Sequence, residues 1–374
     1  MLVNNRCVKN YVFRADASTQ IGIGHVMRCL TLAEGLKNQG HRCLFICRDH
    51  DGHLAGLICN KGFDVQILIT DENLEYDAET LMWNTHAQWL GVSWEFDAQQ
   101  TFEALGKLLV DWLIVDHYAL DARWEQALQG RVSKIMVIDD LLDRSHQCDL
   151  LLDQTYGRNA EEYRTLVKPN CKLLCGAEYA LLRPEFAATR AYSIGRRDDP
   201  AIRRILITLG GVDNDNFTGK ILEVLRESSL PKDCEITVVM GETAPWLSNV
   251  SALAQTMPWR TQVKVGVSDM ARVMAESDLA IGAAGATSWE RCCLGVPTIM
   301  VVLADNQKQV ALALQNAGAA YLLDTSNEFE VKLNALLDGL LKTNTDLSDM
   351  TRFASQVTNG NGLSMVLRYL ESDS

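Results

Sequence analysis

The histidines of this sequence are confined to its first part. All seven lie within the first 146 residues, whereas all seven prolines lie at or after Pro169. Imidazole is the side chain that titrates near neutral pH, so the amino-terminal half is expected to supply any general base. The best-placed candidate is His25, which follows the turn Gly22-Ile23-Gly24 and opens an expected helix. The positive end of a helix dipole favours the neutral, basic form of the ring. Spacing alone is equally compatible with a capping or packing role for His25.

Two further segments place polar side chains directly after an apolar run. Residues 113–118 end in Asp116, His117 and Tyr118, and residues 137–144 carry Asp139 and Asp140. Ligands of parallel α/β sheets bind at the carboxyl ends of the strands, which is where these residues are expected. Aspartates in such places also form turns and cap helices, so each has a structural interpretation as well. We assign no metal to the paired carboxylates.

The carboxy-terminal half carries two turns rich in small residues. In residues 207–216, Gly210 and Gly211 allow a ligand to approach closely, and Asp213 and Asn216 can cap the next helix. In residues 283–290, small residues precede a helix whose free amide groups suit a diphosphate. Glu290 within that helix can accept both hydroxyls of a ribose, or can be a solvated surface charge. Neither turn is a Walker motif, and GIGHVM does not match the fingerprint GxGxxG.

Apolar runs and helical periodicities alternate along the whole chain, which predicts parallel strands joined by crossover helices. The predicted fold class is α/β, with two Rossmann-like, doubly wound domains facing a central cleft. They span residues 1–190 and 200–374, and the polar stretch 187–204 is the expected linker. The expected strands are Tyr11–Arg14, Cys43–Cys47, Val65–Ile69, Trp112–Val115, Ile135–Ile138, Arg204–Thr208, Ile236–Met240, Leu279–Ile281 and Thr298–Val302. One expected helix starts at His25, and three others span Phe217–Leu225, Met270–Glu276 and Ser288–Leu294.

The composition excludes several classes of protein. A chain with 47% hydrophobic and 22% charged residues is too apolar for intrinsic disorder. Its 48 acidic and 35 basic residues give a net charge of −13, which opposes binding to a nucleic-acid backbone. The sequence shows neither a signal-peptide pattern nor a run of about 18 apolar residues, so we expect a cytoplasmic monomer without membrane insertion. Its 11 cysteines form no CxxC pair and are expected to be reduced thiols.

Six motifs carry a resemblance that covers most of the chain. In order they are RADASTQIGIGHVMRCLTLA, IVDHYALD, VIDDLLDRSHQCDLLLDQ, CGAEYALLRPEF, TLGGVDNDN and SWE with the following GVPT. The chain resembles the UDP-2,4-diacetamido-2,4,6-trideoxy-β-L-altropyranose hydrolases of pseudaminic acid biosynthesis, which serves surface glycosylation such as that of flagella. Its carboxy-terminal half more loosely resembles the N-acetylglucosaminyltransferase of peptidoglycan synthesis. The resemblance implies a GT-B fold and hydrolysis without metal or cofactor. It further implies that water attacks the anomeric carbon with inversion and that UDP and the free sugar are released.

The resemblance also implies roles for single residues. The family's catalytic histidine falls on His25, as general base for the water. The residues implied for the sugar pocket are Arg14, Asp16, Gly24, Arg28, Asp116, His117, Tyr118 and Arg183. Those implied for UDP are Gly210, Gly211, Asp213, Asn216, Met240, Val267, Met270, Ala284, Gly285, Thr287, Ser288, Glu290, Asn306 and Gln307. The family often reads Asn-Glu where this chain has Trp289-Glu290, so only the glutamate carries over.

Other functions fit the sequence as well. A GT-B glycosyltransferase would pass the sugar of a UDP-sugar to an acceptor, and a non-catalytic sugar-nucleotide-binding protein would hold it without turnover. The related hydrolysing 2-epimerases also release UDP but invert C2. The aromatic and acidic segment Trp83–Phe96 is expected to be a surface helix-loop, or a lid, with Trp83 and Trp89 partly buried and His86 solvated.

Overall fold

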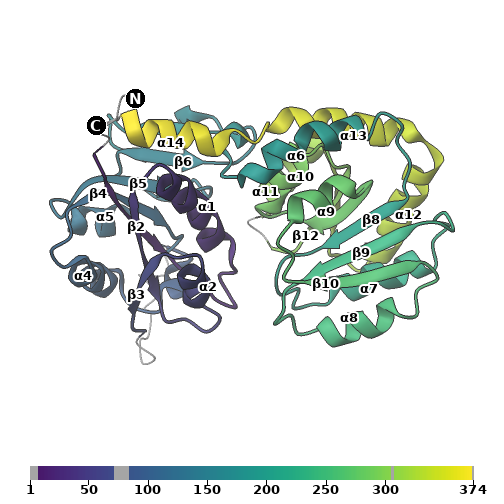
Figure 1. Ribbon diagram of the computed structural model, residues 1–374, viewed down its shortest axis with the longest axis horizontal. Helices are drawn as coiled ribbons and strands as arrows, with labels where there is room; N and C mark the ends of the chain where they lie inside the picture. Colours follow the sequence, from purple (N-terminus) through teal and green to yellow (C-terminus); the bar gives the residue numbers. More distant parts are fainter. Residues whose placement is uncertain (1–6, 71–83, 305–306, 373–374) are drawn as a thin grey trace. The chain divides into compact units, whose positions relative to one another are not determined.

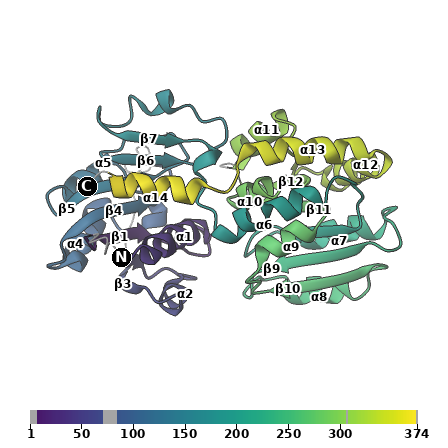
Figure 2. The ribbon, with the colours of Figure 1, turned by 45° about the horizontal axis from the view of Figure 1, so that its top comes forward.

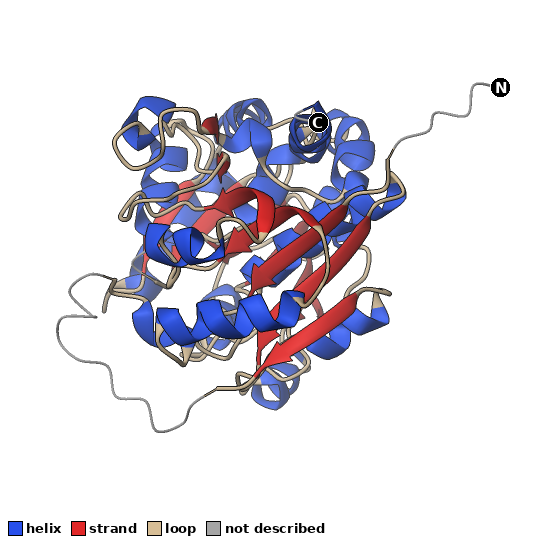
Figure 3. Cartoon of the chain, turned by 90° about the vertical axis from the view of Figure 1, so that its left-hand side faces the viewer, coloured by secondary structure: helices blue, strands red, loops and turns tan. Residues whose placement is uncertain are grey.

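The chain folds into two compact units. The computed structural model describes residues 7–70, 84–304 and 307–372 (Figure 1). Unit 1 consists of Met1–Leu181 together with Leu363–Ser374, and unit 2 of Leu182–Gly362. Both are built on parallel strands with helices packed against them, as the colouring by secondary structure makes clear (Figure 3). The predicted α/β class is confirmed.

Unit 1 is built on a seven-stranded sheet in the order β3-β2-β1-β4-β5-β6-β7. All neighbouring strands in it pair in parallel. Parallel neighbours cannot be joined by a hairpin, so the chain crosses over through helices on the faces of the sheet. The strands are β1 (Asn10–Ala15), β2 (Arg42–Arg48), β3 (Asp64–Leu68), β4 (Val110–Asp116), β5 (Val132–Ile138), β6 (Leu150–Asp153) and β7 (Lys172–Cys175).

Helices cover both faces of this sheet, which explains why β1 and β4 at its centre carry apolar side chains on both faces. In β1, Tyr11 and Phe13 belong to the core on the α1 side, whereas Val12 between them belongs to the core formed with α4 and α5. All three side chains are fully buried. The helices of unit 1 that precede its last segment are α1 (Gly24–Asn38), α2 (Ala55–Asn60), α4 (Trp94–Leu105) and α5 (Ala122–Leu128), with short 3-10 turns η1 (Ala87–Leu90), η2 (Ala160–Tyr163) and η3 (Ala177–Tyr179).

The last helix of the chain, α14 (Gly362–Ser372), completes unit 1. It lies alongside α1 (Figure 2). Its residues Leu363, Val366, Leu367 and Leu370 are part of the same buried cluster as the inner face of α1. Gly35 of α1 permits this approach, because a Cβ there would lie 2.9 Å from Leu367 Cδ1.

Unit 2 repeats the design with a six-stranded parallel sheet in the order β10-β9-β8-β11-β12-β13. Its main core lies between this sheet and α7, α8 and α12, while α6 packs against α9 and α10. The strands are β8 (Arg204–Thr208), β9 (Glu235–Met240), β10 (Arg260–Val265), β11 (Leu279–Ala283), β12 (Thr298–Val302) and β13 (Tyr321–Asp324). The helices are α6 (Pro184–Gly195), α7 (Phe217–Arg226), α8 (Leu247–Ala254), α9 (Met270–Glu276), α10 (Thr287–Cys293), α11 (Lys308–Asn316), α12 (Phe329–Lys342) and α13 (Asn344–Val357).

Each sheet has a topological switch point, where the connections after two adjacent strands run in opposite directions along the sheet. In unit 1 this point lies between β1 and β4, and in unit 2 between β8 and β11. Open α/β sheets bind ligands outside the carboxyl ends of the strands at such points. The segments that leave these four strands carry most of the residues singled out from the sequence.

The division of the chain differs from the prediction in two ways. The boundary lies at Leu182, because the first half of the expected linker is helix α6, whose Phe186 and Ser193 are buried in unit 2. The chain also returns to unit 1 for α14, so residues 363–372 do not belong with the rest of the second half. Strands β6, β7, β10 and β13 were missed; three of them have only four residues, and β10 is largely exposed.

Among the described residues, no helix combines the length and the apolar character needed to cross a lipid bilayer.

Candidate active site

His25 lies in the first turn of α1, close to the carboxyl ends of β1 and β4. It is 7% exposed, and its ring meets that of Tyr118 edge-on at 4.5 Å between centroids. The buried Nδ1 atom has no hydrogen-bond partner among the residues that the structure describes. Burial lowers the pKa of His25 to about 4, so the ring is neutral at pH 7. A neutral imidazole without an internal partner can accept a proton.

Beside His25, an arginine of α1 ties the helix to two strand ends. Arg28 donates to both carboxylate oxygens of Asp116, from Nε at 2.6 Å and from Nη2 at 2.7 Å. Its Nη1 reaches Asp140 at 3.0 Å. Burial acts to raise the pKa of Asp116, but the Arg28 guanidinium outweighs it and keeps this pKa below its usual value. Asp116 is therefore a fixed anion that orients Arg28 and α1.

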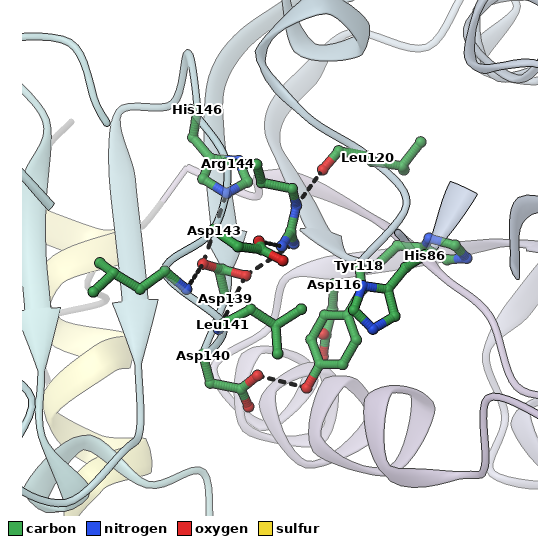
Figure 4. Close-up of polar contacts among 12 residues, drawn as sticks. His86, Asp116, Tyr118, Leu120, Asp139, Asp140, Leu141, Asp143, Arg144 and His146 are labelled. Atoms are coloured by element: carbon green, nitrogen blue, oxygen red, sulfur yellow. Dashed lines mark hydrogen bonds and ion pairs between the residues drawn. The ribbon is translucent and has the colours of Figure 1, made fainter. Parts of the chain in front are cut away.

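Tyr118 connects this ion cluster to the histidine. Its hydroxyl donates to Asp140 at 2.5 Å, as Figure 4 shows, and its ring lies against His25. Asp140 is the more accessible carboxylate, with a side chain 26% exposed, whereas that of Asp116 is fully buried. Tyr118, Asp140 and Arg28 thus present polar groups next to His25, as a sugar-binding wall requires.

Three residues expected in the sugar pocket are instead enclosed in the protein. Arg14 and Asp16 are fully buried and pair at 2.6 Å, and Arg14 also binds Asp97 at 2.6 Å. The Nε2 atom of His117 lies 3.2 Å from Asp16, and its Nδ1 accepts from the Ala119 amide. All three side chains are buried and lie against one another, so they position the ends of β1 and β4.

Asp139 is likewise enclosed. It is fully buried and lies 2.9 Å from Arg144 (Figure 4). It also accepts from the Tyr163 hydroxyl at 3.1 Å. Burial acts to raise its pKa, but Arg144 and His146 hold the pKa well below the usual range. Of the two neighbouring aspartates, only Asp140 therefore faces the candidate site.

An aromatic group that the sequence did not place there borders Tyr118. His86 meets the Tyr118 ring at 5.4 Å and Trp89 stacks on it at 5.8 Å, with 4.7 Å between His86 and Trp89. The prediction that His86 is solvated was wrong, since it is half-buried and burial lowers its pKa. Trp89 is partly buried as expected, whereas Trp83 lies outside the described residues. No spacing rule brings residues 86–89 to Tyr118, because the contact depends on the tertiary fold.

In unit 2, the loop after β8 combines open glycines with helix caps. Gly210 has φ +94° and nothing within 4 Å of a Cβ, whereas Gly211 packs against Gly241. Asp213 accepts from the amides of Phe217 and Thr218, and Asn216 from that of Gly219. The two polar residues are thus occupied in starting α7, and the glycine backbone is the part available to a ligand.

The loop after β11 lies next to it at the switch point. Ala284 and Ser288 are buried, Gly285 and Thr287 are partly exposed, and a Cβ at Gly285 would meet nothing within 4 Å. Glu290 follows in α10, with Arg183 Nη2 at 3.8 Å. Burial raises the pKa of Glu290 to about 7. Arg183 belongs to unit 2, so the structure groups it with the predicted uridine-binding residues.

The remaining predicted UDP residues lie near these loops or outside them. Met240 ends β9 and is buried, Met270 begins α9 and is 9% exposed, and Val267 is partly exposed in the turn before it. Gln307 accepts from the Leu303 amide at 3.0 Å through its side-chain oxygen, so that atom braces its own loop. Asn306 lies outside the described residues. Over the described part of the chain, no three His, Cys, Asp or Glu side chains converge as metal ligands would.

The geometry can be set beside known proteins. Residues 204–361 match the model of the glycosyltransferase family 28 C-terminal domain. The UDP-2,4-diacetamido-2,4,6-trideoxy-beta-L-altropyranose hydrolase of Campylobacter jejuni is 26% identical over 308 residues, 82% of this chain and 96% of that protein. The spore coat polysaccharide biosynthesis protein SpsG of Bacillus subtilis is 26% identical over 309 residues, 82% of this chain and 81% of its own. An uncharacterized Methanocaldococcus jannaschii protein is 24% identical over 298 residues, 79% of this chain but only 55% of its own length.

Among solved structures, that of MurG from Acinetobacter baumannii superimposes with a TM-score of 0.67. The two are 18% identical, and the match covers 97% of this chain and 99% of that one. The fold is GT-B. This agrees with the prediction and places the match to the glycosyltransferase domain on unit 2, whose switch-point loops lie within the matched residues. At this identity the likeness defines the fold and leaves the reaction open.

Proposed function

We propose that the chain is a UDP-sugar hydrolase that cleaves the anomeric C–O bond of UDP-2,4-diacetamido-2,4,6-trideoxy-β-L-altropyranose and releases UDP and the free sugar. The observation that carries this proposal is His25, a desolvated and neutral imidazole whose Nδ1 has no partner among the described residues. The similarity to the hydrolase of Campylobacter jejuni supports the same reaction, because it extends over both units.

In the proposed reaction, the water oxygen bonds to the anomeric carbon while the carbon–oxygen bond to the diphosphate breaks. The bonding electron pair leaves with UDP, and the proton of the water passes to His25. Direct displacement of this kind inverts the anomeric centre. A general base contributes about 10²- to 10⁴-fold to such a step.

The groups around His25 have separate tasks in this proposal. Asp116 and Arg28 hold α1 at the strand ends, and Tyr118 supports the imidazole ring. The low pKa keeps His25 unprotonated at neutral pH, so its ring can accept the proton of the attacking water.

Unit 2 is proposed to hold the UDP. The switch-point loops after β8 and β11 offer backbone amides without obstructing side chains, and Glu290 follows within α10 as an acceptor for the ribose hydroxyls. Uridine diphosphate is a good leaving group, so the protein needs to stabilise its charge but not to activate it covalently.

Transfer of the sugar to an acceptor is the second candidate. It is favoured by the match of residues 204–361 to a glycosyltransferase domain. One assay separates the two reactions: the protein is incubated with the UDP-sugar in ¹⁸O-labelled water without an acceptor, and the products are read by NMR and mass spectrometry.

Hydrolysis at carbon gives free sugar that carries the label and initially has the inverted configuration, with unlabelled UDP. Label in UDP or UMP indicates attack at phosphorus and would contradict the proposed mechanism. Turnover that starts only when an acceptor is added establishes a transferase. A product inverted at C2 indicates an epimerase.

A further inference from the structure

One arginine of unit 2 is buried without a carboxylate partner. Arg291 of α10 is 1% exposed and forms no ion pair within the described part of the chain. Its guanidinium donates to Thr287 Oγ1 at 3.0 Å, to the Ala283 carbonyl at 2.7 Å and to Ser288 Oγ at 3.2 Å. Burial lowers the pKa of Arg291 to about 10, so the group is still charged at pH 7. All three acceptors are neutral, so the charge is desolvated without a hydrogen-bonded counter-charge, and the neighbouring Glu290 interacts with it only through space.

The Arg291 guanidinium lies under the switch point of the sheet. A Cβ at Gly282 would come within 2.6 Å of Arg291 Nη1 and 3.1 Å of the Thr208 carbonyl oxygen. Gly282 belongs to β11 and Thr208 ends β8, so the charge sits at the carboxyl ends of the two central strands. The missing side chain of Gly282 provides the space that the guanidinium fills.

Arg197 shows how the same unit balances another buried arginine that lacks a carboxylate. Its guanidinium donates to the carbonyl oxygens of Ser193, Met274 and Ser277, around the carboxyl ends of α6 and α9. Helix carboxyl ends carry partial negative charge and stabilise a cation. Arg291 has only one carbonyl and two hydroxyls as acceptors, and burial lowers the pKa of both arginines to about 10. A buried charge of this kind is costly unless a counter-charge arrives.

We propose that the counter-charge of Arg291 is the phosphate group of a bound nucleoside diphosphate, held over the loop between β11 and α10. The inference rests on the proposed binding of UDP by unit 2 and adds a residue to it. Arg291 acts from beneath the loop and does not touch the ligand, so it is a positioning residue that also supplies long-range electrostatic attraction.

Thr287 provides a path from the buried charge to the loop surface. Its hydroxyl oxygen accepts from Arg291, so the hydroxyl proton is free to donate in another direction. Thr287 is partly exposed, whereas the hydroxyl of Ser288 is buried against Met300. A phosphate oxygen over the loop can accept from Thr287, and the positive charge behind the hydroxyl strengthens that bond.

The test compares ligands that differ only in phosphate charge. Affinities for uridine, UMP and UDP are measured by calorimetry on the wild-type chain and on Arg291→Met, which keeps the volume but removes the charge. We expect the variant to lose about 10- to 100-fold in affinity for UDP, less for UMP and nothing for uridine, because the lost attraction scales with ligand charge. Thr287→Val should also lose more affinity for UDP than for UMP and none for uridine, with smaller losses than Arg291→Met.

Two further variants separate charge from structure. Arg291→Lys retains the positive charge and should recover part of the UDP affinity. Arg197→Met removes the other buried arginine, whose charge already has carbonyl partners, and should leave the ratio of UDP to uridine affinity unchanged. If Arg291→Met does not fold, Arg291→Lys and Thr287→Val still report the dependence on phosphate charge.

The outcomes are distinct. If the wild-type chain binds none of the three ligands, the proposed function fails and this inference fails with it. If the wild-type chain binds UDP but Arg291→Met weakens uridine and UDP equally, or neither, then Arg291 is only a structural brace of the loop and the inference alone is overturned.

Discussion

The two switch points contain buried charge arranged in opposite ways. At the end of β1 and β4, every buried ion has a partner of opposite sign: Arg14 pairs with Asp16 and Asp97, and Arg28 pairs with Asp116. At the end of β8 and β11, small residues surround Arg291, whose acceptors are neutral. The first arrangement fixes a geometry before any ligand arrives, whereas the second is completed by the ligand itself.

This difference separates the demands of proton transfer from those of binding. A general base needs a defined position and pKa, and a satisfied ion network provides both because none of its members is free to rearrange. An anion site gains affinity from a charge that nothing else neutralises. We therefore expect substitutions in unit 1 to change turnover or folding, and substitutions in unit 2 to change affinity.

The largest effect is expected at His25, the neutral histidine at the switch point of unit 1. His25→Ala should lower kcat by about 10²- to 10⁴-fold while the Kd for UDP stays unchanged, because the base is lost but the nucleotide loops are intact. Steady-state kinetics and calorimetry measure the two quantities. His53→Ala, which changes a partly exposed histidine paired with Asp49, is the matched control. Equal turnover of His25→Ala and wild type would remove His25 from the mechanism.

The ion network itself predicts a large loss of stability. Asp116→Asn deprives Arg28 of its bidentate partner inside the protein and should lower the free energy of unfolding by about 3–5 kcal/mol. Arg291→Met removes a charge that has no ionic partner, so in the absence of ligand it should lower the free energy of unfolding much less. Urea denaturation of the two variants tests the comparison directly. A larger loss for Arg291→Met than for Asp116→Asn would mean that the two switch points do not differ as described.

A smaller effect is expected from the pH dependence of Glu290. Its pKa of about 7 leaves the carboxyl mostly protonated at pH 6 and mostly ionised at pH 8. Only the ionised form accepts from both ribose hydroxyls, so affinity for uridine should rise with pH, by up to about tenfold between these values. Glu290→Gln should bind uridine more weakly and without this rise. Uridine is used because it has no phosphate that titrates in the same range, and a flat profile for the wild type would exclude the ribose role.

The smallest effect concerns the aromatic group beside Tyr118. Trp89→Ala should raise the KM for the UDP-sugar by about three- to tenfold with little change in kcat, because an aromatic face near His25 contributes binding energy to an apolar sugar surface. Substrate should also quench the fluorescence of Trp89. Trp94→Phe, in α4 and under Arg123, is the control that should keep both the KM and the quench. An unchanged KM in Trp89→Ala would place the substrate elsewhere.

Local patterns predicted the strands and helices at the switch points because those elements are buried and strongly periodic. Arg204–Thr208, Met270–Glu276 and Thr298–Val302 have the predicted bounds. Four strands that are short or exposed were missed, and so was the return of the chain to unit 1 after residue 362. Neither feature leaves a local periodic pattern in the sequence.

The candidate site was predicted as a set of loops but not as a set of contacts. The sequence placed His25, Asp116 and Tyr118 at strand ends, and they do lie together. It did not show that Arg14, Asp16 and His117 contact one another, because such contacts depend on distances between separate strands. It also did not predict the burial of Arg291. This arginine directly follows Glu290, and in the sequence it cannot be told from an ordinary charge on a helix surface.

The return of α14 to unit 1 has a consequence for biosynthesis. The residues of unit 2 are continuous in sequence, whereas the apolar face of α1 is covered only by residues 363–372, which follow unit 2. Unit 1 is therefore begun before unit 2 and completed after it. A chain cut just before residue 363 would keep all of unit 2 but would leave the α1 side of the unit 1 core open to chaperones and proteases.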